Sequence, residues 1–419
     1  MPLTPEQTVL IKATVPVLKD HGLDITRIFY VNMIAAHPDL ENIFNKANQV
    51  ELHQPRALAH ALFAYATHIN DLGVLSPAVE LIANKHASLY IRPEQYAIVG
   101  EFLLAAMKEV LGDALTPELH EAWAAAYWQL ANIFIKKEEG IYATLDGWTD
   151  WRDFKIAKKV VESKEITSFY LEPVDGRPLP SFKPGQYISV QIEVPILGHM
   201  QTRQYSLSDA PWEDYYRISV KREAGLDPKA EGAERHPGLV SNIMHDLKNV
   251  GDVVRVSHPQ GDFFLDSTHA AEDWPIVLVS GGVGLTALTS ILNSLVARHS
   301  TRPISWIHAA RSHDVRAFGH HLREIQRTRE NVQAVFFDAK PSPDLILGKD
   351  YDYAGKLDLS RLDKENELYV WNPRTHYYIC GPPGFMVDME KVLLSYGIGK
   401  ERIKMELFGT GGVPRSIGE

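Results

Sequence analysis

The sequence predicts three domains in the order all-α, antiparallel β-barrel and doubly wound α/β. The chain of 419 residues exceeds the length over which one hydrophobic core keeps growing. The spacing of apolar residues changes from about four to two after Trp148, and after Trp274 buried apolar runs alternate with helical segments. We therefore place the domains at residues 1–147, 151–266 and 272–419.

Composition excludes several classes of protein. Hydrophobic residues make up 45% of the chain and charged residues 23%, which is ordinary for a soluble globular protein and not for a disordered one. With 43 basic and 53 acidic residues the net charge is -10, which argues against nucleic acid as a partner. Cys380 is the single cysteine, so no disulfide forms within the chain. No apolar run approaches membrane-spanning length, and we expect a cytoplasmic monomer.

The first third shows helical periodicity. Thr4 to Gln7 carries the signals of a helix start, with an N-cap, a proline and a capping-box glutamine. One helical face is formed by Trp123, Ala126, Tyr127, Leu130, Ile133 and Phe134. Turn residues predict breaks at Asp20 to Gly22, His37 to Asp39, Leu72 to Gly73 and Arg92 to Pro93.

One histidine in this helical third is placed like a metal ligand. A lone histidine is more often a structural residue, and the chain has 18 of them. His86 differs because it shares a helix face with Ile82 and Leu89, shortly before the break at Arg92. Its imidazole is therefore expected to point into an apolar helical pocket.

The middle and last thirds are predicted from strand patterns. Apolar residues alternate with polar ones at Ile188 to Val194 and again at Tyr216 to Val220, which favours an antiparallel barrel. The polar insertion from Gly225 to Gly238 is predicted to be a surface loop. In the last third, the buried runs begin at Ile276, Ile304, Val332 and Tyr377, and alternation with helical stretches predicts a parallel sheet.

A glycine-rich turn follows the first of these runs and matches G-x-G-x-x-[GA], with Ala287 at the last position. Backbone amides in such a turn face a pyrophosphate at the start of a helix. The predicted nucleotide-binding residues are Gly281, Gly282, Val283, Gly284, Leu285 and Thr286. Arg311 ends the second strand where an acidic residue would favour NADH, and an arginine there favours the ribose phosphate of NADPH. Both nicotinamides remain open as donors.

The helical third resembles the haemoglobin domain of the flavohaemoglobins. The resemblance rests on Ile28 to Tyr30, His37 to Phe44, Asn48 to Gln49, Asn84 to His86 and Pro93 to Tyr96. It implies that His86 is the proximal iron ligand, that Phe44 packs on the haem and Lys85 belongs to the haem site, and that Tyr30, Gln54 and Leu58 line the distal side. It also implies that Tyr96 and Glu138 hydrogen-bond the proximal histidine. A carboxylate there makes the imidazole a stronger donor to iron.

Each of these residues has a simpler interpretation when taken alone. Tyr30 and Phe44 are also typical core aromatics, Gln54 is typical of an exposed helix face, and Glu138 lies in the charged run 136–139. Their joint occurrence at the family's spacing favours the haem site.

The segment from Arg203 to Ser206 resembles the R-x-Y-S motif of the ferredoxin reductase family. The resemblance implies an FAD site in which arginine binds the diphosphate and tyrosine stacks on the flavin. By the same resemblance, the residues of this site are Tyr187, Arg203, Gln204, Tyr205, Ser206, Gly238, Val240, Ser241, Glu406 and Phe408. Phe408 is expected to lie on a terminal strand that also carries Glu406, and its ring is expected to shield the flavin.

Cys380, Gly381 and Pro382 resemble the C-G-P motif of the same family, where small residues let nicotinamide approach the flavin. An equally good interpretation of Cys380 is a small buried hydrophobic residue.

The family resemblance spans nearly the whole chain and implies a nitric oxide dioxygenase with haem b, FAD and NAD(P)H. Electrons would pass from NAD(P)H through FAD to haem, where nitric oxide and dioxygen give nitrate, without a separate reductase protein. Two alternatives remain: a haem-based sensor of oxygen or nitric oxide whose reductase keeps iron ferrous, and a flavin reductase with a vestigial haem domain.

Overall fold

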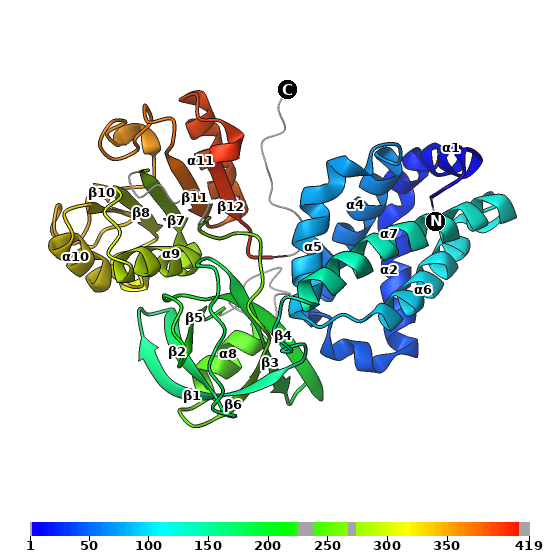
Figure 1. Ribbon diagram of the computed structural model, residues 1–419, viewed down its shortest axis with the longest axis horizontal. Coiled ribbons are helices and arrows are strands. Elements are labelled where there is room, and N and C mark those ends of the chain that lie inside the picture. Colours follow the sequence, from blue (N-terminus) through cyan, green and yellow to red (C-terminus); the bar gives the residue numbers. More distant parts are fainter. Residues whose placement is uncertain (1, 224–237, 267–273, 410–419) are drawn as a thin grey trace.

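The computed structural model describes residues 2–223, 238–266 and 274–409. Its parts follow the predicted order (Figure 1). A helical part, blue to cyan, lies beside a green barrel, and an α/β part, yellow to red, lies against the barrel. Of the predicted insertion, only Gly238 falls within the described residues.

The helical part contains seven α-helices among the described residues and short helical turns between them. They are α1 (Pro5–Ala13), α2 (Val15–Ala36), α3 (Lys46–Val50), α4 (His53–Thr67), α5 (Ser76–Ser88), α6 (Pro93–Leu111) and α7 (Pro117–Tyr142), with turns η1 (Pro38–Asn42), η2 (Leu72–Leu75) and η3 (Gly112–Ala114). The capping box at Thr4 is present, and the predicted helical face of α7 is buried at Trp123, Ala126 and Tyr127.

The predicted break at Asp20 to Gly22 is wrong, because α2 continues through Gly22 to Ala36. The chain bends earlier, at Thr14 between α1 and α2. A Cβ atom on Gly22 would lie 3.5 Å from the Cβ of Ala59 on α4. That distance is an ordinary van der Waals contact, so the packing does not require glycine. The helix continues because Gly22 lies on the buried face that Leu18, Ile25 and Phe29 form on α2. The other three predicted breaks are confirmed.

The middle part is an antiparallel barrel, as predicted. Its elements are β1 (Arg152–Val161), β2 (Ile166–Pro173), β3 (Tyr187–Val194), β4 (His199–Ser206), β5 (Tyr216–Lys221), β6 (Val253–Val256) and helix α8 (Leu239–Asp246). The strand order is β4-β3-β6-β1-β2-β5, and every neighbouring pair is antiparallel. A bridge between Leu207 and Ile218 brings the two edges together and closes the barrel.

The last part is a parallel sheet covered by helices. Its strands are β7 (Ile276–Gly281), β8 (Ile304–Ala310), β9 (Val332–Asp338), β10 (Tyr353–Ala354), β11 (His376–Cys380) and β12 (Ile403–Glu406), and its α-helices are α9 (Leu285–Ala297), α10 (Gly319–Thr328) and α11 (Pro383–Ser395), with turns η5 (Gly282–Gly284), η6 (His313–Val315), η7 (Leu359–Arg361) and η8 (Lys400–Arg402). All neighbouring strands are parallel, and the spatial order is β10-β9-β8-β7-β11-β12. From β7 the chain first adds strands on one side of the sheet, up to β10, and then returns to the other side with β11 and β12. Ligands of such sheets bind in the crevice at the carboxyl ends of β7 and β11.

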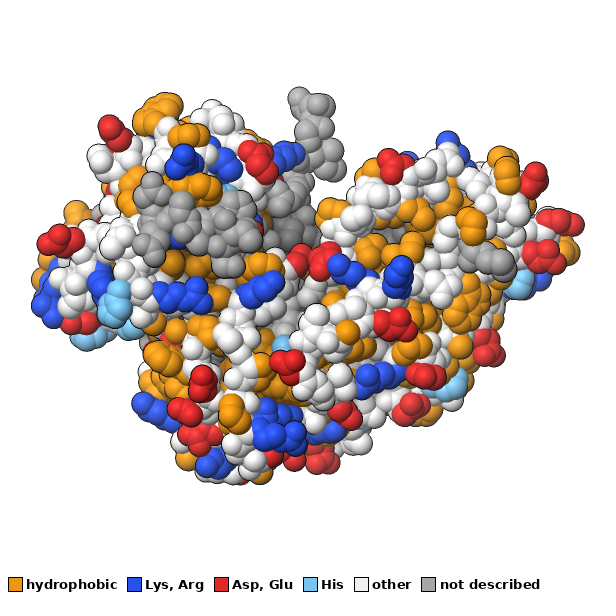
Figure 2. All heavy atoms as spheres, in the orientation of Figure 1, with side chains coloured by type: hydrophobic (Ala, Val, Ile, Leu, Met, Phe, Trp, Pro, Cys, Tyr) orange, Lys and Arg blue, Asp and Glu red, His pale blue; other side chains and the backbone are white. Residues whose placement is uncertain are grey.

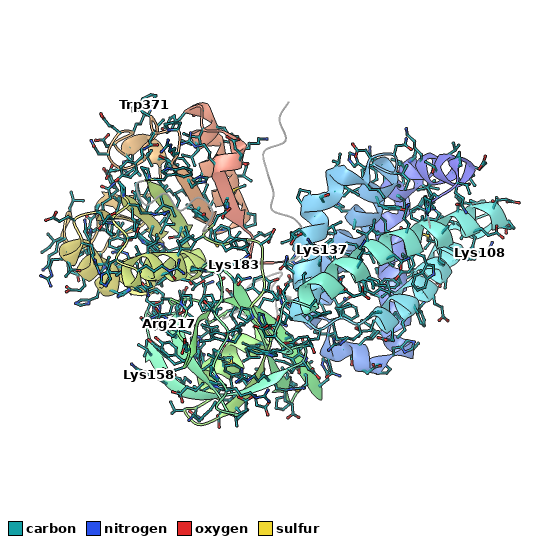
Figure 3. The ribbon with its side chains drawn as sticks, in the orientation of Figure 1. Lys108, Lys137, Lys158, Lys183, Arg217 and Trp371 are labelled. Carbon is teal, nitrogen blue, oxygen red and sulfur yellow. The ribbon has the colours of Figure 1, made fainter. Side chains whose placement is uncertain are left out.

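The barrel contacts the α/β part through Asp209 and Arg217. The Asp209 carboxylate accepts a hydrogen bond of 2.8 Å from Asn293 on α9, and Ser290 donates to the Asp209 carbonyl at 2.7 Å. Arg217 lies on strand β5 of the barrel (Figure 3), and its guanidinium is 5.1 Å from the centre of the Phe318 ring. These contacts hold the predicted flavin and nicotinamide parts against each other.

Strand β3 alternates as predicted, but only part of its polar face meets water. Glu193 is exposed, whereas Ser189 and Gln191 are buried, although they point away from the apolar core of the barrel. Gln191 bonds Thr202 and Arg255 within the barrel, and Ser189 donates a hydrogen bond to Ser88 at the end of α5. Ser189 therefore belongs to an interface between the barrel and the helical part.

On the face of the molecule seen in Figure 2, acidic and basic side chains are intermixed over all three parts. Within the described ranges, no helix is long and apolar enough to cross a membrane.

Candidate functional site

The predicted haem ligand is held by two buried side chains from other helices. His86 lies near the end of α5, and its Nδ1 atom is 2.7 Å from Oε1 of Glu138 on α7. The hydroxyl of Tyr96 on α6 lies 3.0 Å from the same nitrogen and donates to the Glu138 carboxylate at 2.6 Å. The three residues predicted for the proximal side are therefore in one hydrogen-bonded group.

This group sets the tautomer of the histidine. Glu138 is 2% exposed, and an ionised carboxylate can only accept hydrogen bonds, so Nδ1 of His86 carries the proton. Burial, together with the charge of Glu138, raises the pKa of Tyr96, which keeps its phenol as a donor. Nε2 of His86 makes no hydrogen bond with any residue in the described ranges and is left to bind a metal.

Apolar side chains around the imidazole fit a planar macrocycle. The ring of Phe134 lies 5.8 Å from the His86 ring. Phe44, Leu58 and Phe134 pack on the helical core yet keep part of their surface exposed, as residues facing a haem would. No cluster of three or more metal-ligating side chains occurs among the described residues.

Two of the predicted distal residues, Tyr30 and Gln54, each contact a neighbouring side chain. Tyr30 on α2 is nearly buried and meets the ring of Phe44 edge-on at 5.4 Å, and burial raises its pKa, so its phenol stays protonated. Gln54 accepts a hydrogen bond of 2.7 Å from Gln49, which leaves its own amide group free to donate. Both side chains can therefore act as hydrogen-bond donors.

Lys85 extends from the helical part toward the end of the chain. Its ammonium donates to the carbonyl of Gly409 at 2.6 Å. Burial lowers the pKa of Lys85, while the nearby acids Glu406 and Asp262 act in the opposite direction. Lys85 thus lies between the haem part and the segment that follows β12.

The residues of the predicted flavin motif lie on and around β4. Arg203 donates to the carbonyl of Thr202 at 2.8 Å, and burial lowers its pKa. Tyr205 is half-buried and Ser206 buried at the same strand end. Gln204 points elsewhere, because its amide donates at 2.9 Å to Ser88 on the helical part.

Tyr187 at the start of β3 has a tightly fitted ring. A Cβ atom on Gly261 would lie 2.9 Å from this ring, and Gly261 adopts a φ of +118°. Both the close approach and the backbone conformation therefore require glycine at this position. Burial raises the pKa of the Tyr187 hydroxyl, and the nearby Ser88 hydroxyl opposes this shift, but Tyr187 makes no hydrogen bond of good geometry in the described ranges. An orphaned buried hydroxyl is consistent with a partner supplied by a bound flavin. The sequence did not single out Gly261.

Gly238 is the N-cap of α8, as the predicted phosphate site requires. The Ser241 hydroxyl donates to the Gly238 carbonyl at 2.9 Å and accepts from the Glu223 amide at 3.1 Å. Val240 is buried in the barrel core. These two side chains shape the helix start, and its backbone amides are the groups that can contact phosphate.

The glycine-rich turn and the C-G-P segment touch each other. The turn lies between β7 and α9, and a Cβ atom on Gly284 would come within 2.2 Å of the Cys380 carbonyl oxygen. A Cβ on Gly381 would lie 3.2 Å from the Gly281 amide nitrogen. The predicted nucleotide residues therefore meet at the crevice between β7 and β11.

The side chain of Cys380 is fully buried among apolar residues that include Leu278 and Tyr378. Burial raises the pKa of the thiol well above its ordinary value, so it is a neutral thiol. This geometry favours the interpretation of Cys380 as a small buried hydrophobic residue. Its backbone, and that of Gly381 and Pro382, borders the crevice.

Two other predicted residues differ from the simplest expectation. Arg311 is exposed and pairs with Glu165 of the barrel, so a ribose phosphate would have to compete with that carboxylate. Strand β12 ends at Glu406, and Phe408, predicted in the strand, lies beyond it with 42% of its surface exposed. Glu406 is buried, and burial raises its pKa to about 8.

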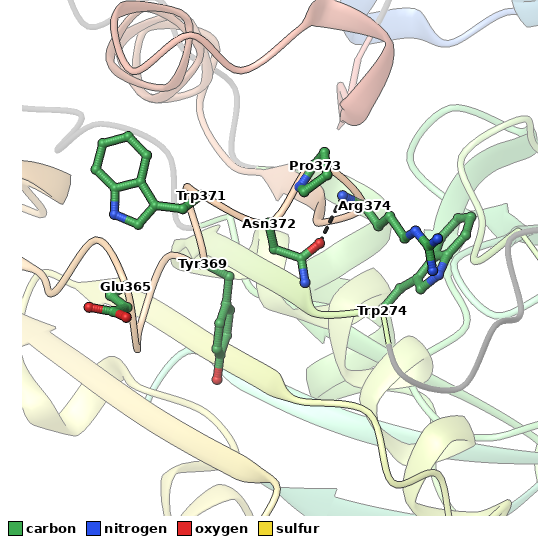
Figure 4. Close-up of a pocket in the computed structure, with 7 residues that line it drawn as sticks. All are labelled: Trp274, Glu365, Tyr369, Trp371, Asn372, Pro373 and Arg374. Carbon is green, nitrogen blue, oxygen red and sulfur yellow. Dashed lines mark hydrogen bonds between the residues drawn. The ribbon is translucent and has the colours of Figure 1, made fainter.

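A pocket of about 470 Å³ lies at the end of the parallel sheet opposite the nucleotide crevice (Figure 4). It is lined by Trp274, Glu365, Tyr369, Trp371, Asn372, Pro373 and Arg374. Trp274 precedes β7 and Arg374 precedes β11, so the pocket adjoins the amino ends of these strands. It has no part in the nucleotide crevice at their carboxyl ends.

The domain types agree with two known families. Residues 27–134 match the globin family, and residues 278–391 match the oxidoreductase NAD-binding domain. With the antiparallel barrel between them, the fold and site define a globin joined to a flavin and nicotinamide reductase.

Relatives share this whole arrangement. A flavohemoprotein of Bordetella parapertussis is 49% identical over 98% of this chain and 100% of its own length. The crystal structure of a flavohemoglobin from Malassezia yamatoensis, with bound FAD and heme, has a TM-score of 0.83 at 30% identity and covers 97% of this chain and 100% of its own. The chain belongs to the flavohaemoglobin family.

A third match covers the reductase alone. The FAD/NAD binding domain of nitric oxide dioxygenase from Vibrio cholerae is 33% identical, with a TM-score of 0.53, over 62% of this chain and 99% of its own.

Proposed function

We propose that this chain is a nitric oxide dioxygenase that binds haem b and FAD and takes electrons from NAD(P)H. The observation that carries the proposal is the buried carboxylate of Glu138 on Nδ1 of His86, in a chain with its own reductase. An anionic partner on the proximal imidazole favours redox chemistry at iron over simple oxygen carriage. The relative named a nitric oxide dioxygenase supports the same reaction.

When bound, FAD accepts a hydride and releases electrons singly, and haem iron uses one electron to convert nitric oxide and dioxygen to nitrate. The chain's residues prepare each site for this chemistry. Glu138 and Tyr96 fix the orientation and tautomer of His86. Tyr30 and Gln54 supply hydrogen-bond donors on the distal side, where negative charge develops on oxygen.

On the reductase side, the close approach of Gly284 and Cys380 shapes the crevice where nicotinamide meets the flavin. Arg203 offers its charge to the FAD diphosphate, and the N-terminus of α8 offers backbone amides. Because Arg311 already pairs with Glu165, we propose that NADH and NADPH both serve as donors.

Turnover tests the proposal directly. Purified protein with NAD(P)H and oxygen is expected to consume nitric oxide continuously and to form nitrate. Because each nitrate requires one electron and NAD(P)H donates two, two nitrates form per nicotinamide oxidised. Consumption that stops after one equivalent of nitric oxide per haem would identify a sensor. A purified chain without a Soret band would leave only a flavin reductase.

A further inference from the structure

Four hydrogen bonds join residues 84–90, the segment that carries His86, to the flavin barrel. The Ser189 hydroxyl on β3 donates to the Ser88 hydroxyl at 3.0 Å. The Gly261 amide donates to the Asn84 side chain at 3.2 Å, and the His258 amide donates to the Tyr90 hydroxyl at 3.0 Å. The three residues on the helical side lie within four positions of His86.

The bonds reach the barrel at residues next to the predicted flavin site. Ser189 is two positions from Tyr187 on the same strand, and Gly261 is the glycine against the Tyr187 ring. Ser88 also accepts a bond of 2.9 Å from Gln204, the second residue of the flavin motif. One serine thus connects the segment carrying His86 to two strands that carry flavin residues.

The hydroxyl of Ser88 is fully used. It accepts from Ser189 and Gln204 and donates to the Lys85 carbonyl at 2.8 Å. Ser88 and Ser189 are both 0% exposed, so water cannot replace either partner. A lost bond there leaves a buried polar group unpaired, which makes the register of the two domains specific.

We propose that Ser88 is a positioning residue that sets the haem part on the flavin barrel for electron transfer between them. The proposal rests on the proposed function, because it requires both cofactors. Ser88 contacts neither reacting group. It acts through the placement of α5, which carries His86 in the same helical turn as Ser88.

The test is Ser88→Ala in the full chain, mixed with NADH without oxygen in a stopped-flow spectrometer. Flavin reduction is expected to keep its wild-type rate, and the following haem reduction to slow by about tenfold, as misplacement of supporting groups does elsewhere. Ser219→Ala is the matched control, because this buried hydroxyl also contacts two serines, Ser168 and Ser208, inside the barrel. The control should change neither rate.

A second readout does not depend on turnover. Amide hydrogen exchange of residues 84–90 should be faster in Ser88→Ala and unchanged in Ser219→Ala, because only the first variant releases α5 from the barrel. Ser189→Ala should reproduce the slow haem reduction, and the double variant should be no slower than Ser88→Ala.

Haem reduction in Ser88→Ala at the wild-type rate, with flavin reduction also unchanged, would overturn this inference alone. A wild-type haem that NADH does not reduce would instead overturn the proposed function.

Discussion

At the scale of single residues, the site depends on side chains whose chemistry is set by burial. Glu138, next to two lysines in sequence, is buried and forms hydrogen bonds with His86 and Tyr96. Leu130, Phe134 and Glu138 are spaced by four on α7, and this spacing already indicated a face shared with apolar residues. Phe134 was predicted as part of this apolar face, and the structure adds that its ring lies 5.8 Å from the His86 ring.

Tyr30→Phe is expected to accelerate oxygen release by about tenfold, since a hydrogen bond of about 1.4 kcal/mol to a charged acceptor is lost. Oxygen dissociation from the reduced protein, followed by rapid mixing with carbon monoxide, measures the rate. Tyr65→Phe is the matched control, because it removes a buried phenol that binds Gln129 in the same domain. An unchanged rate in Tyr30→Phe would remove this tyrosine from the distal side.

The buried carboxyl of Glu406 should make the free energy of unfolding depend on pH. Its folded pKa of about 8 exceeds the ordinary value of 4.5, with burial as the main cause, Asp262 adding to it and Lys85 opposing it. Between these pH values the folded protein holds a proton that the unfolded chain has lost. The stability associated with this group is therefore full below pH 4.5 and is lost as pH rises through 8.

Glu406→Gln should flatten the decline in unfolding free energy over that range by up to about 1.4 kcal/mol per pH unit. Urea unfolding at a series of pH values measures it. Glu139→Gln, which alters an exposed glutamate, is the control and should leave the curve as in wild type. Equal slopes for Glu406→Gln and wild type would contradict a buried, protonated carboxyl.

At the scale of elements, a glycine has different roles at different positions. Gly22 lies within α2, although a glycine in sequence predicted a break there, and an added Cβ would make only an ordinary contact with α4. Gly284 brings the start of α9 against the end of β11, which places the two nicotinamide motifs together. Motif spacing predicted each element, but their mutual contact depends on strand order across about 100 residues of chain.

Gly284→Ala should destabilise the α/β part by about 1–3 kcal/mol, because the added methyl group meets the Cys380 backbone, which cannot move aside as a side chain can. Urea unfolding measures the loss, and flavin reduction by NADH should slow with it. Gly384→Ala is the control, since a Cβ there meets nothing within 4 Å. If both variants were as stable as wild type, the close approach would not exist.

At the scale of the whole molecule, the chain places two electron carriers on one polypeptide. The helical part and the barrel meet through hydrogen bonds, such as that from the Met200 amide to Asn42 at 2.9 Å and that from Gln201 to the Glu41 carbonyl at 3.1 Å. Each part keeps a hydrophobic core of its own. The haem and flavin sites should therefore be filled independently.

His86→Ala is expected to lose haem and keep FAD, because the iron ligand and the flavin motif belong to separate cores. The visible spectrum of the purified variant should show flavin bands without a Soret band. His120→Ala, an exposed histidine on α7, should bind both cofactors. Loss of both cofactors from His86→Ala would contradict the predicted division at residues 147 and 151.

The amino-acid sequence by itself determined the type and order of the elements, the three folds and the motifs that carry chemistry. These depend on apolar periodicity, capping and turn residues, which act within a few positions of the chain. Only the tertiary structure decided that α2 passes through Gly22, that Ser189 and Gln191 of β3 are buried and that Ser88 meets Ser189. The burial of Ser88 and Ser189 depends on residues about 100 positions away in the chain, which local sequence patterns do not predict.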